Sequence, residues 1–251
     1  TIGLLNGYAQ PKEFFVPKAL IIPGHHDHKQ FFYSFGYDGG FDLNLSRTLP
    51  HNFSIFATGN INVLPYYRNE GYRIFKNDYS WSVGAGHFKY DRHNFINVVE
   101  LLVGVGSTGI DNYIVYKNTS EDQDWITKAN YLTAFAQING LAKRKKVEFG
   151  FASRMSYNQY NSLNFYRRGS GFTTQSSNKF KYINFEPAFS FSYLVANFRG
   201  NIQAGISIPL FSQDTELIDS SNSTSIEDYS DIYFFWRLSI QLLKKQEVKR
   251  R

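Results

Sequence analysis

The sequence has no cysteine, so neither a disulfide framework nor a thiolate metal site is available to it. It also lacks any run of about eighteen apolar residues, which excludes a transmembrane helix. No phosphate-binding loop, dinucleotide-binding fingerprint or HExxH motif occurs in its 251 residues. If the chain enters a membrane, it must therefore do so with strands.

Aromatic residues, by contrast, are abundant. They make up 18% of the chain, with 18 Tyr and 24 Phe, although the mean hydropathy is only −0.37. A barrel whose apolar outer surface alternates with polar lumen residues has this combination. A secreted β-sandwich also fits it and is the main soluble alternative. No Pro/Gly/Ser-rich linker divides the middle of the chain, so we expect a single domain.

The clearest pattern is an alternation near the C-terminal end. The apolar set is Ile232, Phe234, Trp236, Leu238, Ile240 and Leu242, and the other set is Tyr233, Phe235, Arg237, Ser239 and Gln241. A period of two places these sets on opposite faces of a strand, one suited to lipid and one to a polar interior. This dyad pattern is typical of a transmembrane β-barrel, which closes because hydrocarbon cannot satisfy a free sheet edge.

Similar runs recur along the chain. They cover about 30–37, 40–47, 53–64, 78–90, 95–106, 126–142, 147–157, 182–195, 198–208 and 232–242. Their connections alternate between short and long, as in bacterial outer-membrane barrels, which have an even strand number and both termini in the periplasm. We therefore predict an all-β, antiparallel up-and-down transmembrane barrel of about ten strands, with eight or twelve as alternatives. The parity slips near Tyr131, which indicates a β-bulge.

The remaining segments are assigned by their lack of period. Residues 1–29 contain three prolines and no sustained alternation, so we expect an extended periplasmic lead-in. Residues 30–243 are the predicted barrel, and residues 244–251 are a basic periplasmic tail. The net charge is +6, but no basic and aromatic residues interleave on one element, so nucleic acid is not an expected partner. Basic segments that flank membrane-spanning strands instead favour contacts with outer-membrane lipid head groups or with an acidic surface of a partner protein.

Charged residues gather on the parity predicted to face the lumen. These are Asp42, Glu100, Glu148, Arg154, Glu186, Arg199 and Arg237. A barrel of eight to ten strands is about wide enough for side chains to fill, so we expect these groups to pair and plug the lumen. Alternatively, Glu148 and Glu186 act as an acid/base pair or bind a small ligand. No His or Ser nucleophile accompanies them on this parity, which weighs against catalysis.

The segment His25-His26-Asp27-His28 is the densest cluster of metal-ligand types. Imidazoles and a carboxylate suit zinc or nickel, and His25 and His28 are the weak metal candidates. Adjacent residues of an extended segment point in opposite directions, so at most two of the four converge. A solvated polar lead-in without a metal is the favoured interpretation, and we expect no cofactor.

One run also carries residue types found in acyl-transfer sites. Such a site needs a Ser next to a His at the mouth of the lumen. Ser80 and Ser82 share one parity, but His87 has the opposite one. We therefore expect no catalytic residues and no enzymatic activity.

Aromatic side chains fall near the ends of several runs. The candidates for an interfacial girdle are Tyr66, Tyr67, Trp81, Tyr157, Tyr166 and Trp236. Tyr and Trp are enriched where a membrane meets water, which favours this interpretation. A carbohydrate-binding aromatic platform is the functional alternative.

With the runs placed, the chain resembles the small outer-membrane β-barrel proteins of Bacteroidetes. The resemblance is one of pattern and covers most of the chain. Its motifs are found in three segments: Tyr8-x-x-Pro11 followed by Ile22-Pro23, the hairpin FFYSFGYDGGFDLNLSRTL, and HNFSIFATGNINV. Some such proteins resemble lipoproteins whose first mature residue is an acylated Cys. Because no Cys is present, that anchor would have to precede Thr1. The resemblance implies an accessory subunit of an envelope machine, such as a barrel-assembly or protein-secretion complex.

The leading hypothesis is thus a non-enzymatic outer-membrane barrel that acts as a structural or accessory subunit with membrane-protein partners. The runner-up is a narrow channel or uptake barrel for a small solute, which needs an open lumen. A lipid-modifying barrel enzyme is the third hypothesis. A soluble β-sandwich, which would stay in solution without detergent, is the fourth.

Overall fold

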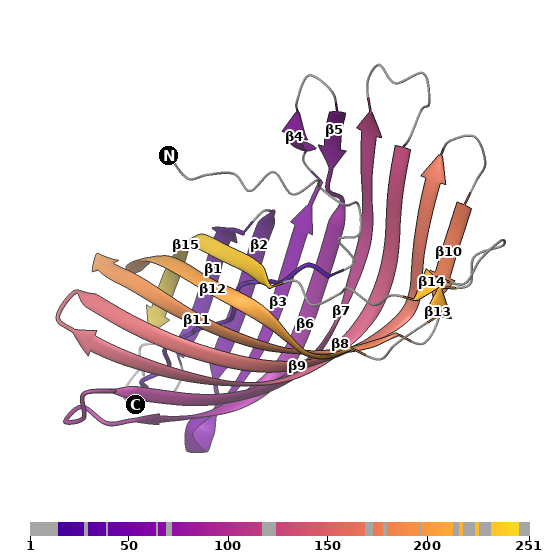
Figure 1. Ribbon diagram of the computed structural model, residues 1–251. Coiled ribbons are helices and arrows are strands. Elements are labelled where there is room, and N and C mark those ends of the chain that lie inside the picture. The colour runs from indigo at the N-terminus through magenta and orange to yellow at the C-terminus, as the bar shows by residue number, and fades with distance from the viewer. Residues whose placement is uncertain are drawn as a thin grey trace.

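The computed structural model describes residues 15–27, 30–38, 40–63, 65–68, 72–116, 124–168, 173–177, 180–195, 197–212, 216–217, 224–225 and 232–245. Ten strands form a closed antiparallel barrel (Figure 1): β1 (Gln30–Tyr37), β2 (Phe41–Thr48), β3 (Phe53–Asn62), β6 (Asp78–Tyr90), β7 (Val98–Tyr116), β8 (Asp124–Arg144), β9 (Val147–Arg168), β11 (Lys181–Val195), β12 (Phe198–Ser212) and β15 (Tyr233–Lys245). Each pairs with the next, and β15 pairs with β1 to close the ring. The predicted ten-stranded barrel is confirmed.

Shorter elements decorate one end of the barrel. These are β4 (Pro65–Arg68), β5 (Tyr72–Phe75), β10 (Thr173–Ser177), β13 (Glu216–Leu217) and β14 (Thr224–Ser225), while the 3-10 turn η1 (Pro50–Asn52) lies between β2 and β3. The turns at 49–52, 91–97 and 145–146 define the short-turn end, and the opposite end, which carries the longer connections, is the long-loop end. Within the described ranges, no helix is long and apolar enough to cross a membrane.

The strands alternate between an apolar outer face and a lumen face. In β11, Phe189, Phe191 and Tyr193 are exposed, whereas Ser190 and Ser192 between them are buried. Large apolar side chains are exposed on all ten barrel strands in the same way, although a soluble protein would bury most of them. The exterior therefore has the dyad pattern of a lipid-facing barrel.

Three strands run further than their apolar alternation predicts. β7 ends at Tyr116 rather than near residue 106, β8 begins at Asp124, and β9 ends at Arg168 rather than near residue 157. Beyond the expected ends, the strands continue through main-chain pairing that does not depend on an apolar outer face. The bulge predicted near Tyr131 is confirmed by a register shift between Asn130 and Tyr131.

Residues 15–27, called the lumen segment from here on, lie inside the barrel and do not form a separate lead-in. The described part of the lead-in is extended as expected, yet residues 20–25 are all buried. Phe15 packs near the long-loop end against Tyr131 and Tyr182, and the segment then runs to the short-turn end, where β1 begins. The expectation failed because the lumen of a ten-stranded barrel leaves room for a chain as well as for side chains.

Candidate functional site

The candidate site is the lumen, where polar side chains of the wall bind the main chain of the lumen segment. Its carbonyl groups accept hydrogen bonds from Arg154 (to Lys18, 3.0 Å), Gln203 (to Leu20, 3.3 Å), Gln137 and Asn139 (to Ile21, 2.6 and 3.2 Å) and Arg199 (to Pro23, 2.9 Å). Its amide groups donate to Asp38 (from Ala19, 3.1 Å) and to Glu100 (from His25, 2.7 Å). The lumen segment has no strand neighbours, and these side chains instead satisfy several of its buried main-chain groups.

Apolar side chains of the lumen segment fill sockets in the same wall. Leu20 and Ile22 belong to one buried cluster, together with Val98, Leu141, Ala152, Ala188 and Phe235. Ile21 points into a second cluster with Phe56, Leu102 and Phe135. The sequence gives little indication of these clusters, because each strand contributes only one or two apolar residues to a lumen face that is otherwise polar.

Gly24 allows the lumen segment to turn where it meets Arg199. Its φ is +69°, a conformation that costs an L side chain energy. A Cβ at this position would also lie 3.0 Å from Nη1 of Arg199. Glycine is therefore required here for both conformation and space.

The seven charged residues predicted for the lumen all lie on its wall. Six of them form three ion pairs between strands: Arg237 with Asp42 (2.5 Å), Arg199 with Glu148 (2.7 Å) and Arg154 with Glu186 (2.6 Å). The seventh, Glu100, pairs instead with His25 of the lumen segment (2.8 Å). Arg154 and Arg199 also bind the segment's main chain, so the network serves the segment as well as itself.

The sequence did not indicate a further pair, between Lys18 and Asp78. The Lys18 ammonium lies 2.6 Å from Asp78 and 2.7 Å from the side-chain oxygen of Asn60. Asp78 is the first residue of β6 and faces the lumen. Lys18 lies in a segment without alternating apolar residues, so the sequence pattern could not assign its side chain to the lumen.

His25 lies in the deepest part of the site and links two strands. Its Nδ1 is 2.8 Å from Glu100 of β7, and its Nε2 is 2.8 Å from Oγ of Ser46 of β2. Its ring packs on Phe32 and Phe88, and its side chain is 0% exposed. The expectation of a solvated polar lead-in is therefore wrong for His25, because a wall carboxylate and hydroxyl stabilise the imidazole inside the barrel.

Ser46, His25 and Glu100 have the order of contacts seen in a catalytic relay of serine, histidine and carboxylate. Ser46 is buried, however, and its hydroxyl also lies 3.2 Å from the carbonyl oxygen of Ile55, to which it can donate. The cavity beside it measures about 10 Å³, room for about one water molecule. The hydroxyl is thus buried beside the lumen segment, and Ser46 and Glu100 together bind His25 of that segment.

No group of three or more metal-ligand side chains occurs in the part of the chain that the structure describes. His28 lies outside the described residues. His26 contacts the side chain of Gln30 and the ring of Tyr90.

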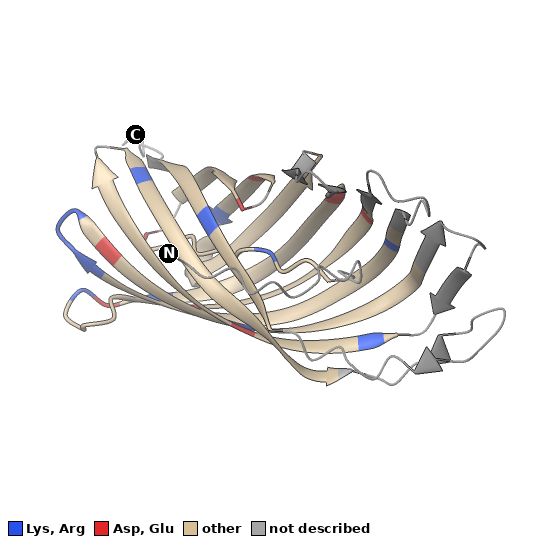
Figure 2. Ribbon diagram, turned by 45° about the horizontal axis from the view of Figure 1, so that its top comes forward, with Lys and Arg blue, Asp and Glu red and all other residues tan. Residues whose placement is uncertain are grey.

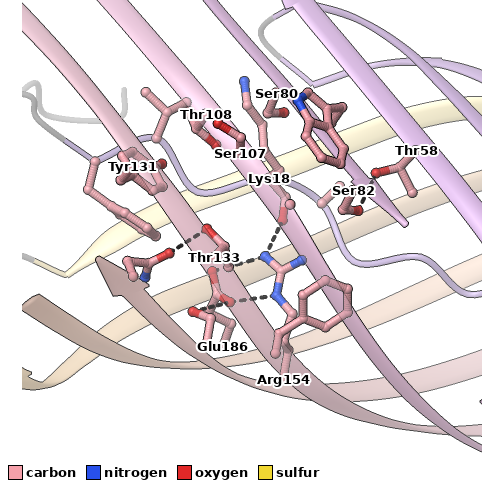
Figure 3. A pocket seen from close by; sticks show the side chains of 18 of the residues that line it. Lys18, Thr58, Ser80, Ser82, Ser107, Thr108, Tyr131, Thr133, Arg154 and Glu186 are labelled. Atoms are coloured by element: carbon pink, nitrogen blue, oxygen red, sulfur yellow. Dashed lines mark hydrogen bonds and ion pairs between the residues drawn. The ribbon is translucent and has the colours of Figure 1, made fainter. Parts of the chain in front are cut away.

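A small cavity remains beside the lumen segment, in the half nearer the long loops (Figure 3). It measures about 70 Å³, room for several water molecules. Its wall is rich in hydroxyl groups, including Thr58, Ser80, Ser82, Thr108 and Thr133. Ser80 and Ser82 line this cavity, whereas His87 is exposed on the outer face against Phe53, so these three residues do not form an acyl-transfer site.

Above the cavity, an open vestibule of about 400 Å³ lies at the long-loop end. Asp38, in the turn between β1 and β2, lines it and accepts hydrogen bonds from Asn60 and from the amide of Ala19. Burial raises the pKa of Asp38 to about 6, and the nearby Lys18 ammonium opposes this shift. This end of the lumen is thus wetter than the end held by His25.

Of the predicted aromatic girdle, Trp81, Tyr157 and Trp236 are exposed on the outer face. The ring of Trp236 lies 5.9 Å from that of Tyr37 on the neighbouring strand. The side chains of Tyr66, Tyr67 and Tyr166 lie outside the described residues.

No protein-family profile and no curated protein sequence matches the chain. Its structure is similar to that of the outer membrane protease OmpT from Escherichia coli, with a TM-score of 0.54 and 10% identity over 86% of this chain and 94% of that one. It is also similar to the translocator domain of the autotransporter NalP from Neisseria meningitidis, with a TM-score of 0.54 and 12% identity over 87% and 88%. At such identities the likeness shows the fold alone, which is that of a small outer-membrane β-barrel. One neighbour is a protease and the other a translocator, so the fold does not decide the activity.

Proposed function

We propose that this chain is a non-enzymatic barrel of the bacterial outer membrane and serves as a structural or accessory subunit of an envelope protein complex. Its short-turn end faces the periplasm in this proposal, as short turns do in outer-membrane barrels. The lipid-facing dyad pattern supports the location. The resemblance to small Bacteroidetes barrels supports the accessory role.

The occupied lumen is the observation that carries the proposal. Between Leu20 and His25 the chain is buried against the wall and is held by Gln137, Arg199 and Glu100. A lumen filled by protein leaves no path for a solute, and a buried Ser46 leaves no reactive hydroxyl for a substrate. What remains for partners is the outside of the barrel.

The long-loop end supplies a surface of the right kind. The upper parts of β7, β8 and β9, together with β5 and β10, form a sheet that projects beyond the short strands β1 and β2 (Figure 1). β9 has 22 residues, about twice what a strand needs to cross a bilayer, whereas β1 has 8. A one-sided projecting sheet suits contact with a neighbouring protein better than closure of a pore.

Photo-crosslinking combined with native purification tests the accessory role. A photoreactive residue at Asn161, exposed just beyond the apolar belt on β9, should give discrete protein adducts in cells. The same residue at Phe151, inside the belt, serves as the matched control and should give few. Equal or absent adducts at both sites, with the protein purifying alone in mild detergent, would contradict the proposal.

The narrow channel is the second candidate, favoured by the cavity and vestibule on one side of the lumen segment. Planar-bilayer recordings separate the two. The purified protein should give no steady current under the leading proposal. A steady, ion-selective current from the unaltered chain would replace it with the channel.

The relay geometry at Ser46 calls for a direct test of the enzyme alternative. The native protein should not react with a fluorophosphonate probe, because the hydroxyl is buried. Ser46→Ala should lower the free energy of unfolding by about 1 kcal/mol through the lost hydrogen bond to His25, without changing any lipid hydrolysis. Labelling of the native chain that disappears in Ser46→Ala would establish an enzyme instead.

A further inference from the structure

The short-turn end carries a rigid platform built from two neighbouring turns. Asn97 joins the turn 91–97 to the β8–β9 hairpin: its amide donates to the carbonyl of Leu141 (2.8 Å), and its side-chain oxygen accepts from the amide of Lys143 (2.8 Å). The carbonyl of Lys146 in turn accepts from the amide of Leu194 of β11 (2.7 Å). Side chains on these turns are therefore presented by a fixed backbone.

The platform is strongly basic. Its exposed cations, Lys89, Arg92, Arg144, Lys145 and Lys146, form no ion pair with any carboxylate among the described residues, and Figure 2 shows the tip of the β8–β9 hairpin as a continuous blue segment. The nearby carboxylate of Asp91 is engaged by its own turn, through the amide of His93 (2.9 Å) and the side chain of Asn94 (2.8 Å). The positive charge is thus left for an external anion.

An exposed apolar surface adjoins these cations. Phe95 is 73% exposed at the tip of the 91–97 turn, and the guanidinium of Arg144 stacks over its ring at 5.4 Å. Ile96 beside it and Leu101 on the outer face of β7 continue the apolar surface toward the middle of the barrel. Phosphate-binding charge directly beside acyl-chain-binding surface is the chemistry of the bilayer interface.

We propose that this platform binds the headgroups of anionic phospholipids, with Phe95 and Ile96 inserted at the acyl-chain boundary. The proposal rests on the membrane location proposed above. An acidic protein partner would need the cations as well, but it would not need two apolar side chains beside them on the lipid-facing side. The apolar neighbours therefore favour lipid.

Nanodiscs of phosphatidylcholine with and without phosphatidylglycerol provide the test. The full-length protein should select spin-labelled phosphatidylglycerol over phosphatidylcholine, and the selection should weaken with salt. Arg92→Gln/Lys145→Gln should lower the selectivity by about fivefold for each cation removed. The matched control, Lys128→Gln/Lys181→Gln, removes two exposed cations elsewhere on the barrel and should leave it unchanged. The charge-preserving variant Arg92→Lys/Lys145→Arg should retain it.

Several outcomes would overturn the proposal. These are an unaltered protein without lipid selectivity, an equal loss in the control variant, and cations that are needed for capture of an acidic protein but not for lipid selection. Failure of the membrane location is a different result, because the protein would then stay in solution and never enter the nanodiscs. A protein that inserts but shows no selectivity contradicts the platform alone.

Discussion

The two halves of the lumen differ in how tightly they hold the same chain. Near the short turns, residues 20–25 are buried, and His25 makes three contacts of 2.8 Å or less, two with Glu100 and one with Ser46, through its amide and its ring. Near the long loops, residues 16–19 are only partly buried and border a cavity and an open vestibule. The seal therefore lies in the half nearer the short turns, and variants in the two halves should have unequal effects.

The largest difference is expected between two carboxylates. Glu100→Ala removes the acceptor shared by the amide and ring of His25 and by Asn139, which leaves buried polar groups unpaired. We expect a loss of about 4 kcal/mol in the free energy of unfolding, measured by urea titration in detergent micelles. Asp111→Ala breaks only the half-exposed pair with Lys128 and should cost about 0.5 kcal/mol or less. Equal losses would show that Glu100 holds the lumen segment no more strongly than an ion pair on the outer face contributes to stability.

A second pair of variants compares packing. Leu20→Ala leaves a hole in a fully buried cluster and should cost about 3 kcal/mol in the same titration. Val16→Ala, in the partly buried stretch, should cost about 1 kcal/mol or less because its surroundings are already open. A larger loss for Val16→Ala than for Leu20→Ala would instead place the seal in the half nearer the long loops.

A third pair of variants compares two glycines that differ in backbone conformation and in the space around them. Gly24→Ala forces a side chain into a positive φ beside Arg199 and should cost about 1.5 kcal/mol. Gly59→Ala, on β3, places its Cβ where no atom lies within 4 Å, so it should be neutral or slightly stabilising. If both changes proved neutral in thermal unfolding, the turn at Gly24 would not constrain the segment.

The smallest effect concerns the wet end. The pKa of Asp38 is raised from 3.8 to about 6, so its contribution to stability is fully present below about pH 4 and is lost as the pH rises toward 6. Asp38→Asn should flatten this part of the stability profile while an oxygen remains to accept from Ala19. The unfolding midpoint of both proteins across pH 4 to 7 is the measurement, and parallel profiles would contradict the assignment.

The barrel could be predicted from the sequence because every strand repeats the alternation of lipid-facing and lumen-facing side chains. The same signal overlooked the ends of β7 and β9, where pairing continues but the apolar face does not. The alternation also assigned the seven charged residues to the lumen face, because the face that a strand residue occupies depends only on its position relative to its neighbours in the sequence.

The lumen segment could not be predicted in the same way. Its contacts join residues far apart in sequence, such as Gln137 with Ile21 and Arg199 with Pro23, and they bind main-chain carbonyls that every residue possesses. Leu20, Ile21 and Ile22 point to different parts of the wall, so no period of two marks them. The relay at His25 was missed because one of its members lies in this segment.

The position of the lumen segment also limits the routes by which the barrel can assemble. The seam between β1 and β15 joins the two ends of the strand series, and β1 follows the lumen segment almost directly along the chain. A closed ring of main-chain hydrogen bonds has no side entrance, so the simplest folding route wraps the wall around the segment and zips this seam last. Leu20, Ile21 and Ile22 would then act as a template on which the later strands collect. Release of the segment from the finished protein requires either lengthwise withdrawal or opening of the seam.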